Sequence, residues 1–363
     1  MLADRIQFTQ KRGFRKVLNQ RVEAYFAEKG LKKRDNPQMY VKTATIFLWL
    51  FGAWGFVLLA PVSLPVRLLG CVVLAFALAA FSFNVGHDAN HNSYSANPGV
   101  NRLLGITYDL IGLSSFLWRY RHNYLHHTYT NILGHDVEIH GDGLVRMSPV
   151  QPHFNFYRFQ QFYIWIFYLF IPFYWFLYDI YLVLSRGKYH EHQIPPFNPW
   201  ELVLLLGIKV LWFGYVFGLP LALGFSWPVV LAGVCVTYMT YGLVICTIFM
   251  LAHVVESTEF LVPDPVSGEV DDEWAICQIR TTANFATQSP LWNWFCGGLN
   301  HQITHHLFPN ICHVHYPQLE PIVQEVCAEF GVEYKVYPTL GAAIASNYRY
   351  LEALGKTPSL SPG

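Results

Sequence analysis

Three short histidine clusters are the residues of this chain whose types and spacing are best suited to chemistry. They read His87-Asp-Ala-Asn-His91, His122-Asn-Tyr-Leu-His126-His127 and His301-Gln-Ile-Thr-His305-His306. Residues four apart are neighbours on a helix, so each cluster would present two or three imidazoles on one face. Imidazole is a ligand for iron, copper, zinc and nickel. Three such clusters predict a site for two metal ions rather than for a single zinc.

Other chemistries fit the sequence less well. A zinc peptidase would need H-E-x-x-H with the glutamate as general base, but the first cluster, which also has three residues between its histidines, has Asp88 in place of the glutamate. Soluble di-iron bundles use paired Glu-x-x-His motifs, and the sequence contains no such pair. It also contains no G-x-S-x-G and no G-x-G-x-x-G. These absences argue against a nucleophilic hydrolase and against a built-in nucleotide or flavin domain.

Neutral imidazoles can hold two iron(II) ions and leave positions open for O2, provided that their second ring nitrogens have oriented partners. An all-imidazole site carries uncompensated positive charge, so carboxylates are expected nearby. The alternative for each carboxylate is an ordinary solvated loop position. The candidate partners, which stand beside the clusters or in adjoining loops, are Asp88, Asn90, Asn123, Asp136, Glu138, Glu256 and Asn300.

The elements that must position these clusters are those of a membrane protein. The chain is 53% apolar, 17% aromatic and only 13% charged, and aromatic residues are typical of membrane interfaces. The formal net charge is zero, which gives no signal for a nucleic-acid partner. The seven cysteines form no C-x-x-C and are interpreted as reduced thiols. No cleavable signal peptide is expected before the first apolar segment.

Four apolar segments are predicted to cross the membrane. They are residues 41–60, 66–83, 201–224 and 227–251. The first cluster begins four residues after the second segment, at its cytoplasmic end. If all clusters serve one site, an even number of crossings must separate them, so we expect the aromatic stretch 162–184, interrupted by Pro172, to lie at the interface. Lys209 is costly within a span unless it snorkels or pairs.

The predicted fold class is an all-α integral membrane protein with four transmembrane helices, interfacial helices and a cytoplasmic cap that carries the histidine clusters. Residues 1–40, with ten of the 24 Lys and Arg, are predicted to form a basic amphipathic helix on the membrane surface, or else an ordinary solvated helix. Residues 41–320 form the membrane domain, and residues 321–363 form a cytoplasmic tail. The positive charge places the N-terminus in the cytoplasm.

The chain resembles the membrane fatty acid desaturases, with their H-x-x-x-H, H-x-x-x-H-H and (H/Q)-x-x-H-H boxes, and is most similar to the front-end, acyl-CoA desaturase-like branch. The resemblance covers most of residues 40–320 and is carried by residues 86–91, 121–128, 281–285 and 297–309. It implies an oxygen-dependent di-iron enzyme that removes hydrogens from adjacent carbons of a long acyl chain. Two electrons come from an outside donor.

The resemblance also implies a set of metal ligands. These are His87, His91, His122, His126, His127, His253, His305 and His306. In the third box, Gln302 occupies the first ligand position of the front-end pattern, but His301 stands where an aromatic is usual and repeats the spacing of the second box. His301 is therefore either a ninth ligand or a residue behind the ligands. We favour Gln302 as the ligand, directly or through a water.

The resemblance leaves several partners open. The sequence has no H-P-G-G motif, so no fused cytochrome b5 domain is expected, and the electron donor is predicted to be a separate ferredoxin or cytochrome b5 with its reductase. The acyl chain would be carried on CoA, acyl carrier protein or a membrane lipid. The alternatives are a hydroxylase or an acetylenase with the same site. A metal transporter is less favoured. Transporters place polar ligands near the membrane midplane, whereas the histidine clusters of this chain are predicted to lie at one edge of the membrane.

Overall fold

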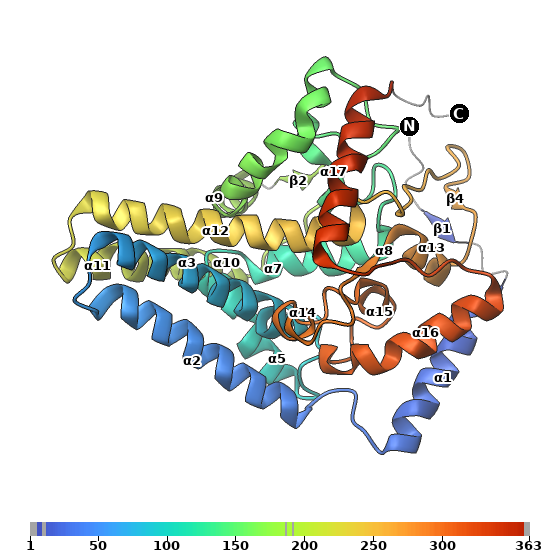
Figure 1. Ribbon diagram of the computed structural model, residues 1–363, viewed down its shortest axis with the longest axis horizontal. Helices are drawn as coiled ribbons and strands as arrows, with labels where there is room; N and C mark the ends of the chain where they lie inside the picture. Colours follow the sequence, from blue (N-terminus) through green and yellow to red (C-terminus); the bar gives the residue numbers. More distant parts are fainter. Residues whose placement is uncertain (1–5, 9–11, 186, 191, 359–363) are drawn as a thin grey trace. The chain divides into compact units, whose positions relative to one another are not determined.

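The computed structural model describes residues 6–8, 12–185, 187–190 and 192–358, and these are mostly helical (Figure 1). Parts of the predicted N-terminal helix, residues 1–5 and 9–11, and the end of the predicted tail lie outside the described residues. The chain divides into two compact units. Unit 1 comprises Met1–Arg34, Arg121–Ile164 and Ile248–Gly363, and unit 2 comprises Asp35–Tyr120 and Trp165–Thr247.

Five helices in the described part of the chain are long and apolar enough to cross a membrane. They are Pro37–Leu59, Leu64–Asn90, Asn155–Ser185, Pro199–Ala222 and Trp227–His253. Four of them correspond to the predicted spans, and the remaining one contains the aromatic stretch 162–184. The predicted multi-pass helical membrane protein is thus confirmed, whereas the total of four crossings stays a prediction.

The helix α9, Gln160–Ser185, continues through Pro172, so the predicted interruption at this proline is wrong. A proline removes the N–H that would bond the carbonyl four residues earlier, which here belongs to Tyr168. Gly242 of α12 lies against this point, where a Cβ would come within 2.3 Å of the Tyr168 oxygen and 2.6 Å of Pro172 Cδ. Close packing against a residue without a side chain accommodates the proline inside the helix.

Unit 2 holds the helical hairpin α2–α3 and the first histidine box. The helices α2 (Pro37–Leu59) and α3 (Leu64–Phe81) lie side by side (Figure 1). From α3 the chain passes without a break through a π-helix, η1 (Ser82–Gly86), into α4 (His87–Asn90). The other elements of this unit are α5 (Pro98–Gly105), α6 (Thr107–Leu110), α7 (Ser115–Trp118), most of α9, β2 (Lys188–Tyr189), β3 (His192–Gln193), α10 (Pro199–Phe213), η6 (Gly214–Gly218), α11 (Leu219–Ala222) and most of α12 (Trp227–His253).

Lys209 on α10 is buried and finds partners within unit 2. Its ammonium donates hydrogen bonds to the carbonyl oxygens of Gly112 (3.0 Å) and Phe176 (3.2 Å) and lies 3.4 Å from a carboxylate oxygen of Asp179. It also lies 4.0 Å from the centroid of the Phe176 ring. The predicted cost of this charge in an apolar segment is therefore offset by pairing and by hydrogen bonds rather than by snorkelling.

Unit 1 is built around a small apolar core. The N-terminal helix α1 (Phe14–Lys29) packs along α16 (Tyr316–Phe330) and also contacts α13 (Trp274–Thr281) (Figure 1). Its apolar face, Phe14, Leu18, Val22 and Phe26, is buried in this core. The prediction that α1 is amphipathic is confirmed, but its apolar face contacts protein. The placement of this helix on the membrane surface stays a prediction.

The remaining described elements of unit 1 are short, apart from α17. They are β1 (Gln7–Phe8), η2 (Arg119–His126, whose first two residues belong to unit 2), α8 (His127–Tyr129), η3 (Val137–Ile139), η4 (Gly141–Gly143), η5 (Asn155–Phe159), β4 (Glu269–Val270), β5 (Asn284–Phe285), α14 (Pro290–Phe295), α15 (Gln302–Leu307), η7 (His313–His315), β6 (Val336–Tyr337) and α17 (Leu340–Lys356). The pairs β1–β4 and β5–β6 are parallel, and β2–β3 is antiparallel. The described part of the tail contains most of α16, together with β6 and α17.

Candidate metal centre

Three histidines from three separate segments of unit 1 meet in its interior. They are His126 on η2, His253 at the end of α12 and His306 on α15, and each offers a ring nitrogen such that all three nitrogens lie within 4.8 Å of one another. The ring centroids lie 4.6 Å (His126–His253) and 5.0 Å (His126–His306 and His253–His306) apart. None of these side chains is exposed. Buried imidazoles that converge in this way suit a transition-metal ion.

His126 is oriented by a carboxylate. Its Nδ1 lies 2.9 and 3.1 Å from the two oxygens of Asp136, while its buried Nε2 has no hydrogen-bond partner among the described residues. Asp136 is itself fixed, because it accepts hydrogen bonds from the backbone N–H groups of Asn131 and Glu138. A carboxylate behind one ring nitrogen, with the other left for the metal, is the usual arrangement around protein metal ions. The predicted role of Asp136 fits this geometry.

His306 is oriented by an amide and a hydroxyl instead. Its Nδ1 lies 2.7 Å from Gln278 Oε1 and 3.1 Å from Thr130 Oγ1. Burial, together with the neighbouring imidazoles, holds the pKa of His306 well below its usual value. The ring is therefore neutral near pH 7, which is the form that binds a metal.

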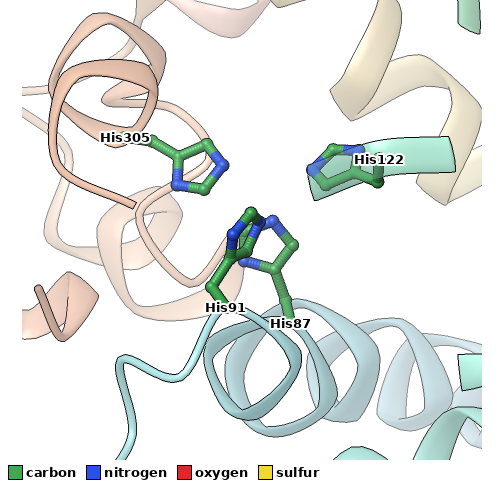
Figure 2. Close-up of side chains that lie close together, drawn as sticks. All are labelled: His87, His91, His122 and His305. Carbon is green, nitrogen blue, oxygen red and sulfur yellow. The ribbon is translucent and has the colours of Figure 1, made fainter. Parts of the chain in front are cut away.

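A second group of histidines in unit 1 comes from the same two boxes. His127 Nε2 lies 3.3 Å from His122 Nε2, and the His127 ring stacks on His306 with centroids 4.3 Å apart. The rings of His122 and His305 are nearly parallel at 6.3 Å (Figure 2). Behind the group, Tyr316 Oη lies 3.3 Å from His305 Nδ1. All six histidines of unit 1 that the resemblance implies as ligands thus lie in one buried cluster.

The first box lies in unit 2. His87 and His91 project from the end of the helix that continues α3, with ring centroids 4.6 Å apart (Figure 2). The Trp118 ring contacts both imidazoles, with ring centroids 5.6 Å from that of His87 and 5.5 Å from that of His91. Asn90, between the two histidines, donates to the carbonyl oxygens of Gly86 and Gly105 and accepts from Arg119 at 3.0 Å. The predicted position of this box at a helix end is confirmed.

In the third box, Gln302 and His301 have different surroundings. The Gln302 amide nitrogen lies 3.0 Å from His253 Nε2 and 3.1 Å from His306 Nε2, so the amide end of this side chain points at the cluster. His301 precedes the helix, with φ −102° and ψ 50°. Its Nδ1 lies 2.9 Å from Glu320 and its Nε2 lies 3.1 Å from Asn293 Oδ1. Protein groups therefore face both ring nitrogens of His301.

The other predicted partners occupy varied positions. Glu138 accepts from Arg121 and lies 3.8 Å from His122 Nδ1, and Asp88 lies 3.9 Å from His87 Nδ1. Asn300 donates to Asn293, which connects it to His301. Asn123 lies beside His122 on η2. Glu256 forms a half-exposed ion pair with Arg349, which gives it a partner other than an imidazole.

Sequence reasoning missed the groups that hold His305 and His306. Gln278, Tyr316 and Glu320 lie outside the boxes in sequence, whereas Thr130 closely follows the second box. One available signal was Gln278, a polar side chain among the apolar residues of Trp274–Thr281. From the sequence alone, which does not show its contact with His306, Gln278 could equally be a solvent-exposed residue of a helix.

Unit 2 also contains a large apolar cavity of about 590 Å³. It extends along α3 from Leu64 to Phe81 and is also lined by side chains of α2, α6, α11 and α12. Thr107, which lines it, lies directly against Gly86, where a Cβ would come within 3.0 Å of the threonine hydroxyl. The cavity therefore approaches the helix turn that carries the first box.

Comparison with known sequences decides the family. The sequence model of the fatty acid desaturase family matches residues 63–338. The chain belongs to the fatty acid desaturase family. It is 79% identical to the sn-1 linoleoyl-lipid 6-desaturase of Synechocystis sp., over 98% of this chain and 99% of that protein. It is 49% identical to the enzyme of the same name from Arthrospira platensis, over 98% and 96% of the two chains.

A more distant relative is the acyl-lipid (8-3)-desaturase of Physcomitrium patens. It is 32% identical over 94% of this chain and 71% of that protein. The predicted family and branch are thus confirmed, and this desaturase is an oxidoreductase that acts on fatty acyl chains. Its buried imidazole cluster is compatible with a metal site.

Proposed function

We propose that this desaturase introduces a double bond at carbon 6 of a linoleoyl chain esterified at the sn-1 position of a membrane lipid. The observation that carries the proposal is the 79% identity to an sn-1 linoleoyl-lipid 6-desaturase over nearly the full length of both chains. Of the carriers left open by the sequence, the lipid is favoured, because three relatives are named as lipid desaturases.

The proposed cofactor is a pair of iron ions. Its ligands are the two histidines of the first box, the six histidines of unit 1 described above and the amide of Gln302. Bound iron would supply the activation of O2 that breaks the C–H bonds of the acyl chain. Support comes from the donor set, which is buried and backed by Asp136, Gln278 and Thr130. His301 is assigned a role behind the ligands, because Glu320 and Asn293 face its ring nitrogens.

The protein side chains have three tasks in this proposal. Asp136 fixes the orientation of the His126 ring so that Nε2 faces the metal. Burial excludes water from the cluster, which protects a strong oxidant from side reactions. The apolar cavity along α3 offers a long hydrocarbon chain a binding surface of the usual size for ligand sites.

The proposed orientation places both termini, the histidine boxes and the site in the cytoplasm. Support comes from the ten Lys and Arg residues among the first 40, since positive loops face the cytoplasm. The electrons come from a separate donor protein of the ferredoxin or cytochrome b5 type.

Expression in a host whose lipids contain linoleate tests the proposal. We expect a new fatty acid with an added double bond starting at carbon 6, found in lipids and released by an sn-1-specific lipase. A hydroxylated or acetylenic product, or a double bond at another carbon, would contradict it. A protein with His126→Ala serves as the control and should give no product.

A further inference from the structure

We propose that an acidic one-electron carrier protein docks on the surface formed by Arg15, Lys16 and Trp274, and that Trp274 couples this surface to the second histidine box. The inference rests on the proposed function, because a desaturase must receive electrons from outside. It adds the docking surface and the residue through which reduction proceeds.

The side chain of Trp274 connects the protein surface with the histidine cluster. It is the first residue of α13 and is partly exposed. The exposed Arg15 of α1 places its guanidinium carbon 4.6 Å from the centre of the Trp274 ring. On its other side, the indole Nε1 donates a hydrogen bond of 3.3 Å to the carbonyl oxygen of His127. One aromatic residue therefore spans from a surface cation to a box histidine.

The contact continues from His127 into the cluster. His127 Nε2 lies 3.3 Å from His122 Nε2, and its ring stacks on His306 at 4.3 Å with an angle of 17° between the planes. The steps from Arg15 to these imidazoles are a cation–π contact, a hydrogen bond to the His127 backbone, the covalent bonds of His127 and a ring stack, all within unit 1. Such a short and rigid route suits electron entry.

Two of the three acidic residues that precede Trp274, Asp272 and Glu273, have partners, whereas Asp271 is exposed. The two carboxylate oxygens of Glu273 accept hydrogen bonds from the backbone N–H groups of Gly13 and Arg15, which also positions Arg15 over the indole. Asp272 faces Arg12 at 3.7 Å. Lys16, next to Arg15, is exposed. A carrier with acidic groups around its redox centre would find complementary charge here, and such charge speeds association more than it strengthens binding.

A lipid surface is the other anionic partner to consider, and the structure favours the protein. A helix that lies on a membrane needs a free apolar face as well as basic residues. The apolar face of α1 is buried against α16 and α13. The basic face also leads to the redox site through Trp274, a connection that lipid binding would not use.

The electron balance requires such a partner. In one turnover two C–H bonds of the acyl chain are broken and one carbon–carbon π bond forms. O2 is reduced to two waters by four electrons, two from the acyl chain and two from the carrier, which delivers them singly. The two hydrogens from the chain and two protons from solvent complete the waters.

The test compares two ways of reducing the full-length protein reconstituted in phosphatidylcholine vesicles. In the first, a reduced acidic [2Fe–2S] ferredoxin supplies electrons, and the steady rate of product formation is measured. In the second, dithionite reduces the iron before O2 is admitted, and the product of a single turnover is measured. Lys16→Glu and Arg15→Glu are compared with Lys356→Glu, a matched charge reversal at an exposed lysine of α17.

We expect Lys16→Glu and Arg15→Glu to lower the ferredoxin-driven rate about tenfold at low salt, with the difference shrinking at high salt as charges are screened. Lys356→Glu should leave the rate within about twofold. All three should retain the single-turnover yield and the iron content of the wild type. Trp274→Leu should slow ferredoxin reduction in the same selective way, and Trp274→Phe, which keeps a ring over which Arg15 can stack, should slow it less.

Three results would overturn the inference. One is an equal effect of Lys356→Glu and Lys16→Glu on the ferredoxin-driven rate. Another is a Trp274→Leu protein that ferredoxin reduces as fast as the wild type, or that loses single-turnover yield in proportion to its rate. The third is an effect of Lys16→Glu that appears only when phosphatidylglycerol is added to the vesicles, which would assign the surface to lipid. Failure of the proposed function is distinct, because the wild type would then form no product in the single turnover.

Discussion

The histidines of unit 1 and those of unit 2 are held in place in different ways. In unit 1, polar side chains from distant segments reach the imidazoles, as Asp136 reaches His126 and Gln278 reaches His306. In unit 2, the polar group at the first box, Asn90, bonds to backbone carbonyls of its own helix and of α5. The comparison indicates that side chains from distant segments orient rings in unit 1, whereas Asn90 in unit 2 fixes the helix turn that carries both histidines of the first box.

Loss of a ligand should have the largest effect. Replacing His126 or His306 by Ala removes a group that has no substitute at the centre of the cluster, so we expect no detectable turnover and loss of iron. His140, which lies outside the boxes and is exposed, provides the control, and His140→Ala should keep near-normal activity. Product analysis and iron content measure both. Normal activity in both ligand variants would disprove the assignment of these residues.

The third box offers the next largest difference. Gln302→Ala should lose iron and most activity, since its amide faces His253 and His306. His301→Tyr should retain substantial activity, because an aromatic residue fits the front-end pattern and its hydroxyl can contact Glu320. Iron content and turnover of the two proteins are compared side by side. Full loading of Gln302→Ala, with loss in His301→Tyr, would reverse the assignment.

Variants in the two units should lose different properties. Asp136→Asn keeps the shape of the side chain but weakens the orientation of His126, so iron affinity or activity should fall about 10- to 100-fold. Asn90→Ala instead removes buried hydrogen bonds, each costing about 1–3 kcal/mol when a partner is left unsatisfied. Its thermal midpoint and activity should fall together. If Asp136→Asn lost stability without losing iron affinity, the comparison between the units would not hold.

The sequence was most informative where spacing alone determines neighbours. The boxes, the apolar segments and the amphipathic α1 follow from local periodicity, and the structure agrees with each. The surface covered by α1 does not follow, because amphipathicity shows that a helix has an apolar face without showing whether protein or lipid covers it. Likewise, Gln278 and Glu320 reach the boxes only through tertiary packing. Pro172 was misread because the compensating residue, Gly242, lies 70 residues away in sequence.

Glu256 should show the smallest effect. It was predicted to orient a ligand, but Arg349 binds its carboxylate with hydrogen bonds of 2.9 and 2.6 Å at a half-exposed position. This contact holds the pKa of Glu256 below its usual value. When the pKa of a carboxyl group is lower in the folded than in the unfolded state, the ionised group stabilises the fold at pH values above the unfolded-state pKa. This contribution is lost as the pH falls through the folded-state pKa. Exposed pairs contribute about 0.2–1 kcal/mol, so Glu256→Gln should barely lower the thermal midpoint near pH 7.

The acid dependence sharpens this last expectation. The difference in thermal midpoint between Glu256→Gln and the wild type should disappear below the usual glutamate range, where the wild-type carboxyl is protonated in both states. Iron content and turnover should stay within about twofold of the wild type, since the effect of an exposed ion pair on stability is small. An iron loss comparable with that of Asp136→Asn would instead mean that Glu256 acts on the metal site, and that exposure is a poor guide to which carboxylates orient the ligands.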